Sequence, residues 1–184
     1  RVDGLRKGIT KVNLPYAELS QLPAEICGLE NVEELSLEGN QLKDLPPGLG
    51  SMSKLTTVNL SDNQLKKVPS ALAELKNLQE LDLSGNKFKK KSEIWEDLKE
   101  LAGLKQLNLG GNSIGPPPED LSVLSSLETL NLSGVSLKNE KLAQMIKSLG
   151  TLPALSSLDL SSCKISEVPD EILDLKGLKS IDLS

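Results

Sequence analysis

Aliphatic residues recur along the chain in one short pattern, in which an anchor residue is followed by further aliphatic residues three and five positions later. In the segment 32–37 these are Val32, Leu35 and Leu37. Eight anchors follow one another at separations of 23, 23, 23, 26, 23, 28 and 23 residues: Ile9, Val32, Leu55, Leu78, Leu104, Leu127, Leu155 and Leu178. A period in the twenties is typical of stacked units that bury their apolar faces only against their neighbours. The sequence therefore predicts a solenoid with one repeat per anchor.

The residues that follow each anchor alternate in polarity as in a β-strand. In the segment 55–60, Val58 and Leu60 are expected to face the core, whereas Thr57 and Asn59 face outward. The strands must be parallel, because every connection returns through a whole repeat. We therefore expect one parallel sheet with one strand from each repeat.

An asparagine follows four of the strands at the point where the chain is expected to turn inward: Asn40, Asn63, Asn86 and Asn112. A buried asparagine can bond backbone groups of its own turn and of the neighbouring turn, so these four are predicted to form a structural ladder along the solenoid. Ala17, Val135 and Cys163 replace the asparagine in three other repeats. We expect looser turns there.

The return segment of the ordinary repeat contains Leu-Pro or Val-Pro, with the prolines at Pro23, Pro46, Pro69 and Pro169. Proline fixes φ and disfavours a long helix, which predicts a short 3₁₀ segment or one to two helical turns after each of them.

Two longer repeats lack this proline and are predicted to carry α-helices. In the 26-residue repeat, Ser92 is expected to cap a helix with Ile94, Leu98 and Leu101 on one face. In the 28-residue repeat, Asn139 is expected to cap a helix that ends at Gly150. The apolar face of this second helix would consist of Leu142, Met145, Ile146 and Leu149.

The pattern Leu-x-x-Leu-x-Leu-x-x-Asn-x-Leu-x-x-Leu-Pro runs from Val32 to Pro46, with valine in the first place, and resembles that of the leucine-rich repeat family. The 23-residue repeats are similar to those of intracellular scaffolds of the Ras-binding group. The 28-residue repeat, followed by Cys163 in the asparagine position, is similar to the ribonuclease-inhibitor subclass. The resemblance implies an α/β fold, a right-handed horseshoe with a parallel sheet on its concave face and short 3₁₀ or α-helical segments on its convex face. It also implies a protein partner bound on the concave face.

Residues 1–184 are expected to form a single domain, because no linker rich in glycine, serine or proline interrupts the repeats. Solenoid ends are usually capped by polar units, and Ser184 directly follows the strand residue Leu183. We therefore expect the chain to be a fragment of a longer protein.

The outward strand positions are predicted to form the partner-binding surface, with Tyr16, Glu38 and Asp62 on its rim. These positions are all polar, and neighbouring strands hold such side chains about 5 Å apart. The alternative is that they only keep an open sheet face hydrated. The predicted binding residues on the strands are Lys11, Asn13, Glu34, Ser36, Thr57, Asn59, Glu80, Asp82, Gln106, Asn108, Thr129, Asn131, Asp159 and Asp182.

The net charge of −5 argues against a nucleic-acid partner and favours a protein with a basic patch. That patch would meet an acidic stretch formed by Glu33, Glu34, Glu38, Glu80 and Asp82. Tyr16 is the only aromatic residue expected near this surface, which predicts moderate affinity, because strong interface anchors are mostly Trp, Tyr and Arg.

One basic run, Lys87 with Lys89, Lys90 and Lys91, surrounds Phe88, which is expected to face the core. The run is either a solvated loop or a contact for an anionic partner. Trp95 stands where other repeats have proline, and we expect it to pack in the helix rather than to anchor a partner.

An enzyme is not expected. The chain has no histidine, which excludes Ser-His and Cys-His pairs and histidine metal sites, and it has no phosphate-binding glycine motif. Asp159 and Asp182 are adjacent in their column, but two carboxylates alone are weak evidence for a cation, so we expect neither a metal nor a cofactor.

Cys27 and Cys163 lie six repeats apart, too far for a disulfide, and are expected to be free thiols. Neither end of the chain carries a cystine cluster, and no apolar run reaches the length of about 20 residues that spans a membrane. The sequence thus predicts a monomeric, cytoplasmic, non-catalytic scaffold or adaptor without membrane contact. The alternative is the recognition domain of a larger enzyme, such as a ligase or kinase, or of an immune sensor.

Overall fold

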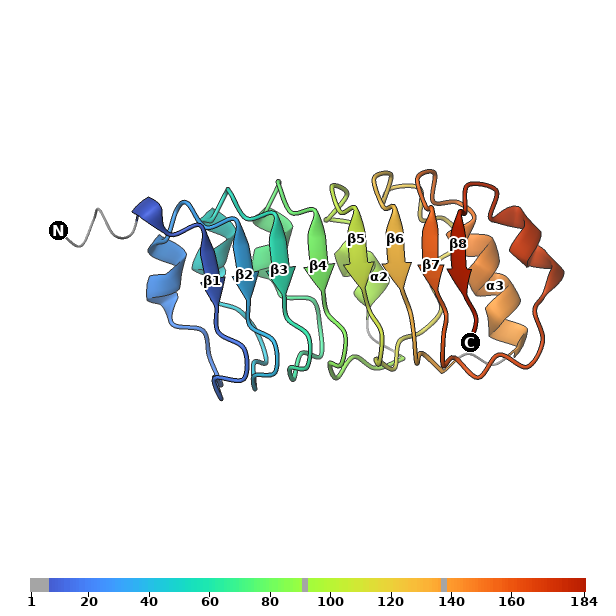
Figure 1. Ribbon diagram of the computed structural model, residues 1–184, viewed down its shortest axis with the longest axis horizontal. Coiled ribbons are helices and arrows are strands. Elements are labelled where there is room, and N and C mark those ends of the chain that lie inside the picture. The colour runs from blue at the N-terminus through green and yellow to red at the C-terminus, as the bar shows by residue number, and fades with distance from the viewer. Residues whose placement is uncertain (1–6, 91–92, 137–138) are drawn as a thin grey trace.

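The computed structural model describes residues 7–90, 93–136 and 139–184. Within these residues each repeat contributes one three-residue strand, and the strands form a single parallel sheet in chain order (Figure 1). The strands are β1 (Lys11–Asn13), β2 (Glu34–Ser36), β3 (Thr57–Asn59), β4 (Glu80–Asp82), β5 (Gln106–Asn108), β6 (Thr129–Asn131), β7 (Ser157–Asp159) and β8 (Ser180–Asp182). The predicted sheet is confirmed.

The register of the sheet follows the repeat through both insertions. Glu80 lies opposite Gln106 across the 26-residue repeat, and Thr129 lies opposite Ser157 across the 28-residue repeat. The extra residues are therefore accommodated on the return path, and the strand positions stay aligned along the whole sheet.

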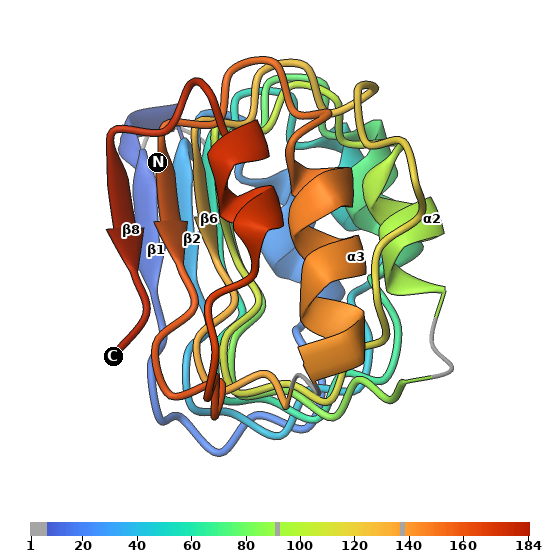
Figure 2. The same ribbon diagram turned by 90° about the vertical axis from the view of Figure 1, so that its right-hand side faces the viewer.

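In the part of the chain that the structure describes, four 3₁₀ helices cover the return path of the ordinary repeats, and each begins directly after one of the four predicted prolines. They are η1 (Ala24–Gly28), η2 (Pro47–Ser51), η3 (Ser70–Glu74) and η4 (Asp170–Asp174). The prediction of short 3₁₀ segments is confirmed. Figure 2 shows the sheet at the left with α2 and α3 to its right, so both of these helices lie behind one face of the sheet.

The helix in the 26-residue repeat, α2 (Ile94–Leu98), is shorter than predicted. The N–H of Leu101 donates to Leu98 at 2.9 Å, which is a three-residue turn rather than a helical bond, although Leu101 is buried. Ser92, the predicted cap, lies outside the described residues.

The helix in the 28-residue repeat, α3 (Asn139–Leu149), starts at Asn139 itself and ends directly before Gly150. Its four predicted apolar residues, Leu142, Met145, Ile146 and Leu149, are all buried, which confirms the predicted face.

The core consists almost entirely of aliphatic side chains, with two aromatic exceptions. Phe88 is buried, as predicted. Trp95 is also buried, and its Nε1 donates to the carbonyl of Gly115 at 3.0 Å, which confirms packing within the convex layer. Cys27 and Cys163 are both free thiols, as predicted.

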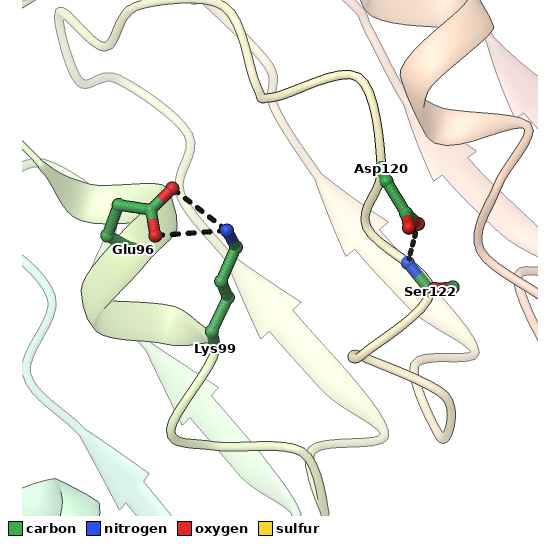
Figure 3. A network of polar contacts seen from close by, with 4 residues as sticks. All are labelled: Glu96, Lys99, Asp120 and Ser122. Atoms are coloured by element: carbon green, nitrogen blue, oxygen red, sulfur yellow. Dashed lines mark hydrogen bonds and ion pairs between the residues drawn. The ribbon is translucent and has the colours of Figure 1, made fainter.

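Two polar contacts on the convex side join residues that are near in sequence (Figure 3). Lys99 Nζ bonds both carboxylate oxygens of Glu96 at 2.9 Å, and the carboxylate of Asp120 accepts the N–H of Ser122 at 2.8 Å. The bond from Ser122, with a smaller effect of Lys99, holds the pKa of Asp120 below its ordinary value. None of the helices in the described ranges is long and apolar enough to cross a membrane.

Candidate functional site

The outward strand residues stand in two columns on the sheet face opposite the helices, which we call the concave face. The middle residue of each strand points to the core and is buried in β2 to β7. The first column holds the first residue of each strand: Lys11, Glu34, Thr57, Glu80, Gln106, Thr129, Ser157 and Ser180. The second column holds the last: Asn13, Ser36, Asn59, Asp82, Asn108, Asn131, Asp159 and Asp182.

Most side chains of the second column form a hydrogen bond with the backbone of the turn that follows their own strand. In Asp82, for example, Oδ1 accepts the N–H of Ser84 at 2.8 Å and its hydroxyl at 2.6 Å. The same backbone bond, two residues along the chain, is made by Asn59, Asn108, Asn131, Asp159 and Asp182. Such Asx turns satisfy backbone N–H groups where a strand ends. These six predicted binding residues therefore have a structural role that the sequence analysis missed.

First-column side chains contact one another across neighbouring repeats. Lys11 Nζ forms a 2.7 Å salt bridge with Glu34, and both side chains are about half exposed or more, at 67% and 48%. Gln106 Nε2 donates to Glu80 Oε1 at 3.3 Å. Exposed contacts of this kind are weak and exchange readily with other partners. The first column is thus less committed to the fold than the second column.

A shallow depression of about 370 Å³ lies at the centre of the concave face, across β3 to β6. Asn108 Nδ2 donates to Asp82 Oδ2 at 3.0 Å within it, so the second column is joined sideways as well as to its own turns. The polar residues that line the depression are Thr57, Asn59, Glu80, Asp82, Gln106, Asn108, Thr129 and Asn131.

The concave face and its rim are acidic. Lys11 is the one cation among the predicted binding residues. Seven of these residues are carboxylates: Glu34, Glu38, Asp62, Glu80, Asp82, Asp159 and Asp182. Carboxylates held on one surface attract a cationic partner and steer its approach.

The rim residue Tyr16 is 66% exposed, and its hydroxyl donates to Glu38 Oε1 at 2.7 Å. This hydrogen bond, together with the charge of Glu38, raises the pKa of Tyr16. The Tyr16 ring covers Gly39, so a Cβ added at that glycine would clash with it. Asp62 covers Gly85 in the same way two repeats later.

These rim residues occupy one repeat position that adopts positive φ in the first seven repeats: Tyr16, Gly39, Asp62, Gly85, Gly111, Gly134 and Ser162. Left-handed conformation favours glycine, which explains the four glycines. Tyr16 and Asp62 each precede a repeat with glycine there, which leaves room for their side chains.

The predicted asparagine ladder lies behind the rim. Asn63 Nδ2 donates to Leu37 in the preceding repeat at 2.9 Å and to Leu60 in its own repeat at 3.2 Å, while Oδ1 accepts the N–H of Leu42 at 2.9 Å. Asn40 and Asn86 make the corresponding bonds. Asn112 keeps its donated bonds, but its buried Oδ1 has no partner in the described structure. The ladder therefore ties each turn to the one before it and weakens at the 26-residue repeat.

No group of three or more Cys, Asp or Glu residues is placed to hold a metal ion within the described ranges. The side chains of Asp159 and Asp182 lie opposite each other in register, and each already accepts its own turn N–H.

Two family models, both described as leucine-rich repeat, match the chain. One covers residues 30–88, and the other covers 77–101, 103–124 and 154–175, so that together they span more than half of the sequence. No curated protein sequence matches the chain closely enough to count as a relative.

Several solved structures are similar. An internalin (inlF) of Listeria monocytogenes is 26% identical with a TM-score of 0.62, and the match covers 89% of this chain and 51% of that one. The chain thus spans about half the length of that internalin.

Two further structures are similar in fold. Internalin C2 (inlC2) of Listeria monocytogenes is 23% identical with a TM-score of 0.62, over 97% of this chain and 82% of that one. A leucine-rich repeat protein of Leptospira interrogans is 24% identical with a TM-score of 0.54, over 97% and 67%. The repeat spacing, the strand register and the two matching models show that the chain belongs to the leucine-rich repeat family.

Proposed function

We propose that the chain is a non-catalytic scaffold or adaptor that binds a protein partner on its concave face. Leucine-rich repeat domains generally mediate protein–protein interactions, and solenoids of this kind offer an extended concave surface. The observation that carries the proposal is the first column, whose polar side chains are exposed or partly exposed and run in register along the whole sheet beside the central depression.

The partner surface is proposed to be basic, because the concave face presents seven carboxylates and one lysine. Within this surface, Glu34 and Glu80 are the first-column carboxylates, and neither holds a backbone turn. The contact is of moderate affinity and weakens as salt rises, since exposed charges are screened beyond about 8 Å at physiological ionic strength. We propose that the chain acts as a monomer.

Affinity capture from a cytosolic lysate tests the proposal. The variant Glu34→Lys/Glu80→Lys reverses two first-column charges and leaves the turn-forming Asp82 intact. A matched control, Glu74→Lys/Glu100→Lys, makes the same change in charge at exposed convex positions. The proposal predicts a basic protein captured by the parent and the control, and lost from the first variant. Equal capture by all three would refute concave binding.

The proposal also covers the subtype of the repeats and the cellular compartment of the protein. We infer Ras-group-like repeats from the four proline-led 3₁₀ segments, and one ribonuclease-inhibitor-like repeat from α3 with Cys163 after it. Two free thiols support a reducing compartment, the cytoplasm. Fractionation of the natural protein tests the compartment. A role as the recognition domain of a larger enzyme or immune sensor stays a prediction.

A further inference from the structure

Lysines occupy equivalent positions in three successive repeats at the edge of the solenoid where the strands end. Lys43, Lys66 and Lys89 each directly follow a core residue of their repeat that is at most 2% exposed. Each of these lysines lies eleven residues after its anchor.

Backbone hydrogen bonds keep the repeats aligned up to these lysines. The N–H of Gln64 donates to Leu42 at 2.9 Å, and the N–H of Lys87 donates to the equivalent Leu65 at 2.8 Å. Because stacked strands are about 4.8 Å apart, lysines in equivalent positions stand side by side. Only the run near Lys87 is contiguous in the sequence; the stacking of repeats brings Lys43 and Lys66 beside it.

Lys67 and Lys90 follow next in their repeats, which widens the column into a patch. We call this patch the lysine edge and define it as Lys43, Lys66, Lys67, Lys87, Lys89 and Lys90, all exposed. Lys91 lies outside the described residues.

Two carboxylates lie near Lys67. Asp44 forms an exposed salt bridge with Lys67 at 3.6 Å. Burial raises the pKa of Asp97, and the nearby charge of Lys67 partly offsets this increase. Glu93 and Glu96 also lie near Asp97, and Glu96 is paired with Lys99. The six lysines outnumber these carboxylates on a chain whose net charge is −5.

A hollow of about 440 Å³ opens beside Lys43. Side-chain amides of Gln21, Gln41 and Gln64 line it. The other lining residues besides Lys43 are Ser20, the apolar Leu22, Leu45 and Pro46, and Asp44, whose carboxylate is paired with Lys67. Amides can bond the backbone or the carboxyl groups of an extended chain, and the apolar residues can pack against its aliphatic stems.

We propose that the lysine edge and this hollow bind an extended acidic segment of a partner protein, at a site separate from the concave face. The lysines meet its carboxylates and the hollow holds one or two of its side chains. A peptide fits better than an anionic membrane, because none of the exposed large apolar residues of the described structure belongs to this edge. It also fits better than a nucleic acid, whose long phosphate backbone would be repelled by the acidic remainder of the chain.

The test uses a fluorescein-labelled peptide of alternating glutamate and serine, whose binding is followed by fluorescence anisotropy at low salt. The variant Lys43→Glu/Lys66→Glu reverses two charges of the edge. The control, Lys105→Glu/Lys179→Glu, reverses two exposed lysines that precede β5 and β8, at the opposite edge of the sheet. Circular dichroism verifies that each variant is folded.

The proposal predicts that the edge variant binds the peptide at least about tenfold more weakly than the parent, and the control within about twofold. The concave-face variant Glu34→Lys/Glu80→Lys should bind the peptide as strongly as the parent does, which separates this site from the concave face. Absence of binding to the parent, or an equal loss in the edge variant and its control, would overturn the proposal. Binding of the parent to phosphatidylserine vesicles but not to the peptide would also overturn it, in favour of a lipid surface.

Discussion

The thiol of Cys163 donates a 3.2 Å hydrogen bond to the carbonyl of Leu132, the residue that follows β6 in the preceding repeat. Asn63 and Asn86 donate to the equivalent carbonyls of Leu37 and Leu60 at 2.9 Å. Cys163 therefore supplies one bond of the asparagine ladder in a repeat that lacks asparagine. Val135 has no side-chain donor and cannot supply it.

Burial of Cys163 predicts a protected thiol. Burial raises the pKa of both Cys27 and Cys163, and Cys163 is only 1% exposed. In a Cys27→Ser variant, which leaves one thiol, we expect a disulfide reagent at neutral pH to react at least about 100-fold more slowly with the native protein than in urea. Equal rates in the two conditions would show that Cys163 is accessible and that the ladder is open there.

The ladder predicts unequal costs for removing its asparagines. Asn63→Ala leaves the buried Leu42 N–H without a partner and removes one of the two amide donors from the carbonyls of Leu37 and Leu60, and we expect a loss of about 3 kcal/mol in the free energy of unfolding. Asn112→Ala should cost about 1 kcal/mol less, because the Asn112 Oδ1 has no partner to lose. Urea denaturation of both variants measures the difference, and an equal loss would contradict this view of the ladder.

The contact between Tyr16 and Glu38 predicts a raised pKa for Tyr16. Absorbance measured against pH reports this pKa directly, because the chain has one tyrosine. The neutral hydroxyl donates to Glu38, and a tyrosinate would be repelled by the same carboxylate, so the pKa of Tyr16 lies above its ordinary value. In Glu38→Gln the repulsion is removed and the pKa should fall back toward that value. An unchanged titration curve would show that the two side chains do not interact in solution.

Gly39 is predicted to be coupled energetically to Tyr16. Alanine at Gly39 must adopt a φ of +67°, which costs about 1 kcal/mol, and its Cβ also meets the Tyr16 ring. We expect Gly39→Ala to destabilise the parent more than it destabilises a Tyr16→Ala variant. A double-mutant cycle measures this coupling. If the stability losses caused by Gly39→Ala and Tyr16→Ala simply add, the Tyr16 ring does not contact Gly39 in solution.

Sequence predicted the strands well because a strand position depends mainly on local alternation. Val58 and Leu81 are buried between polar neighbours, as the period of two requires. The shortened α2 was not predicted, because Leu101 keeps an apolar place in the core without remaining helical.

Two further features that sequence reasoning missed depend on contacts that the repeat pattern does not show. The turn bond of Asp82 requires its side chain to fold back onto Ser84, so an outward polar residue is partly committed to the backbone. Lys43 and Lys66 lie far from Lys89 along the chain and are brought near it only through the stacking of repeats. Aligning the repeats by their anchors would have found this lysine column, because the lysines share one repeat position.

Photo-crosslinking from single positions tests concave binding most directly. A photoreactive phenylalanine analogue at Gln106 in the first column, or at Thr57, samples the central depression, and one at Glu74 samples the convex face. In a cytosolic lysate, our account predicts that Gln106 and Thr57 label the same protein and that Glu74 does not. Labelling of a specific partner from Glu74 alone would contradict it.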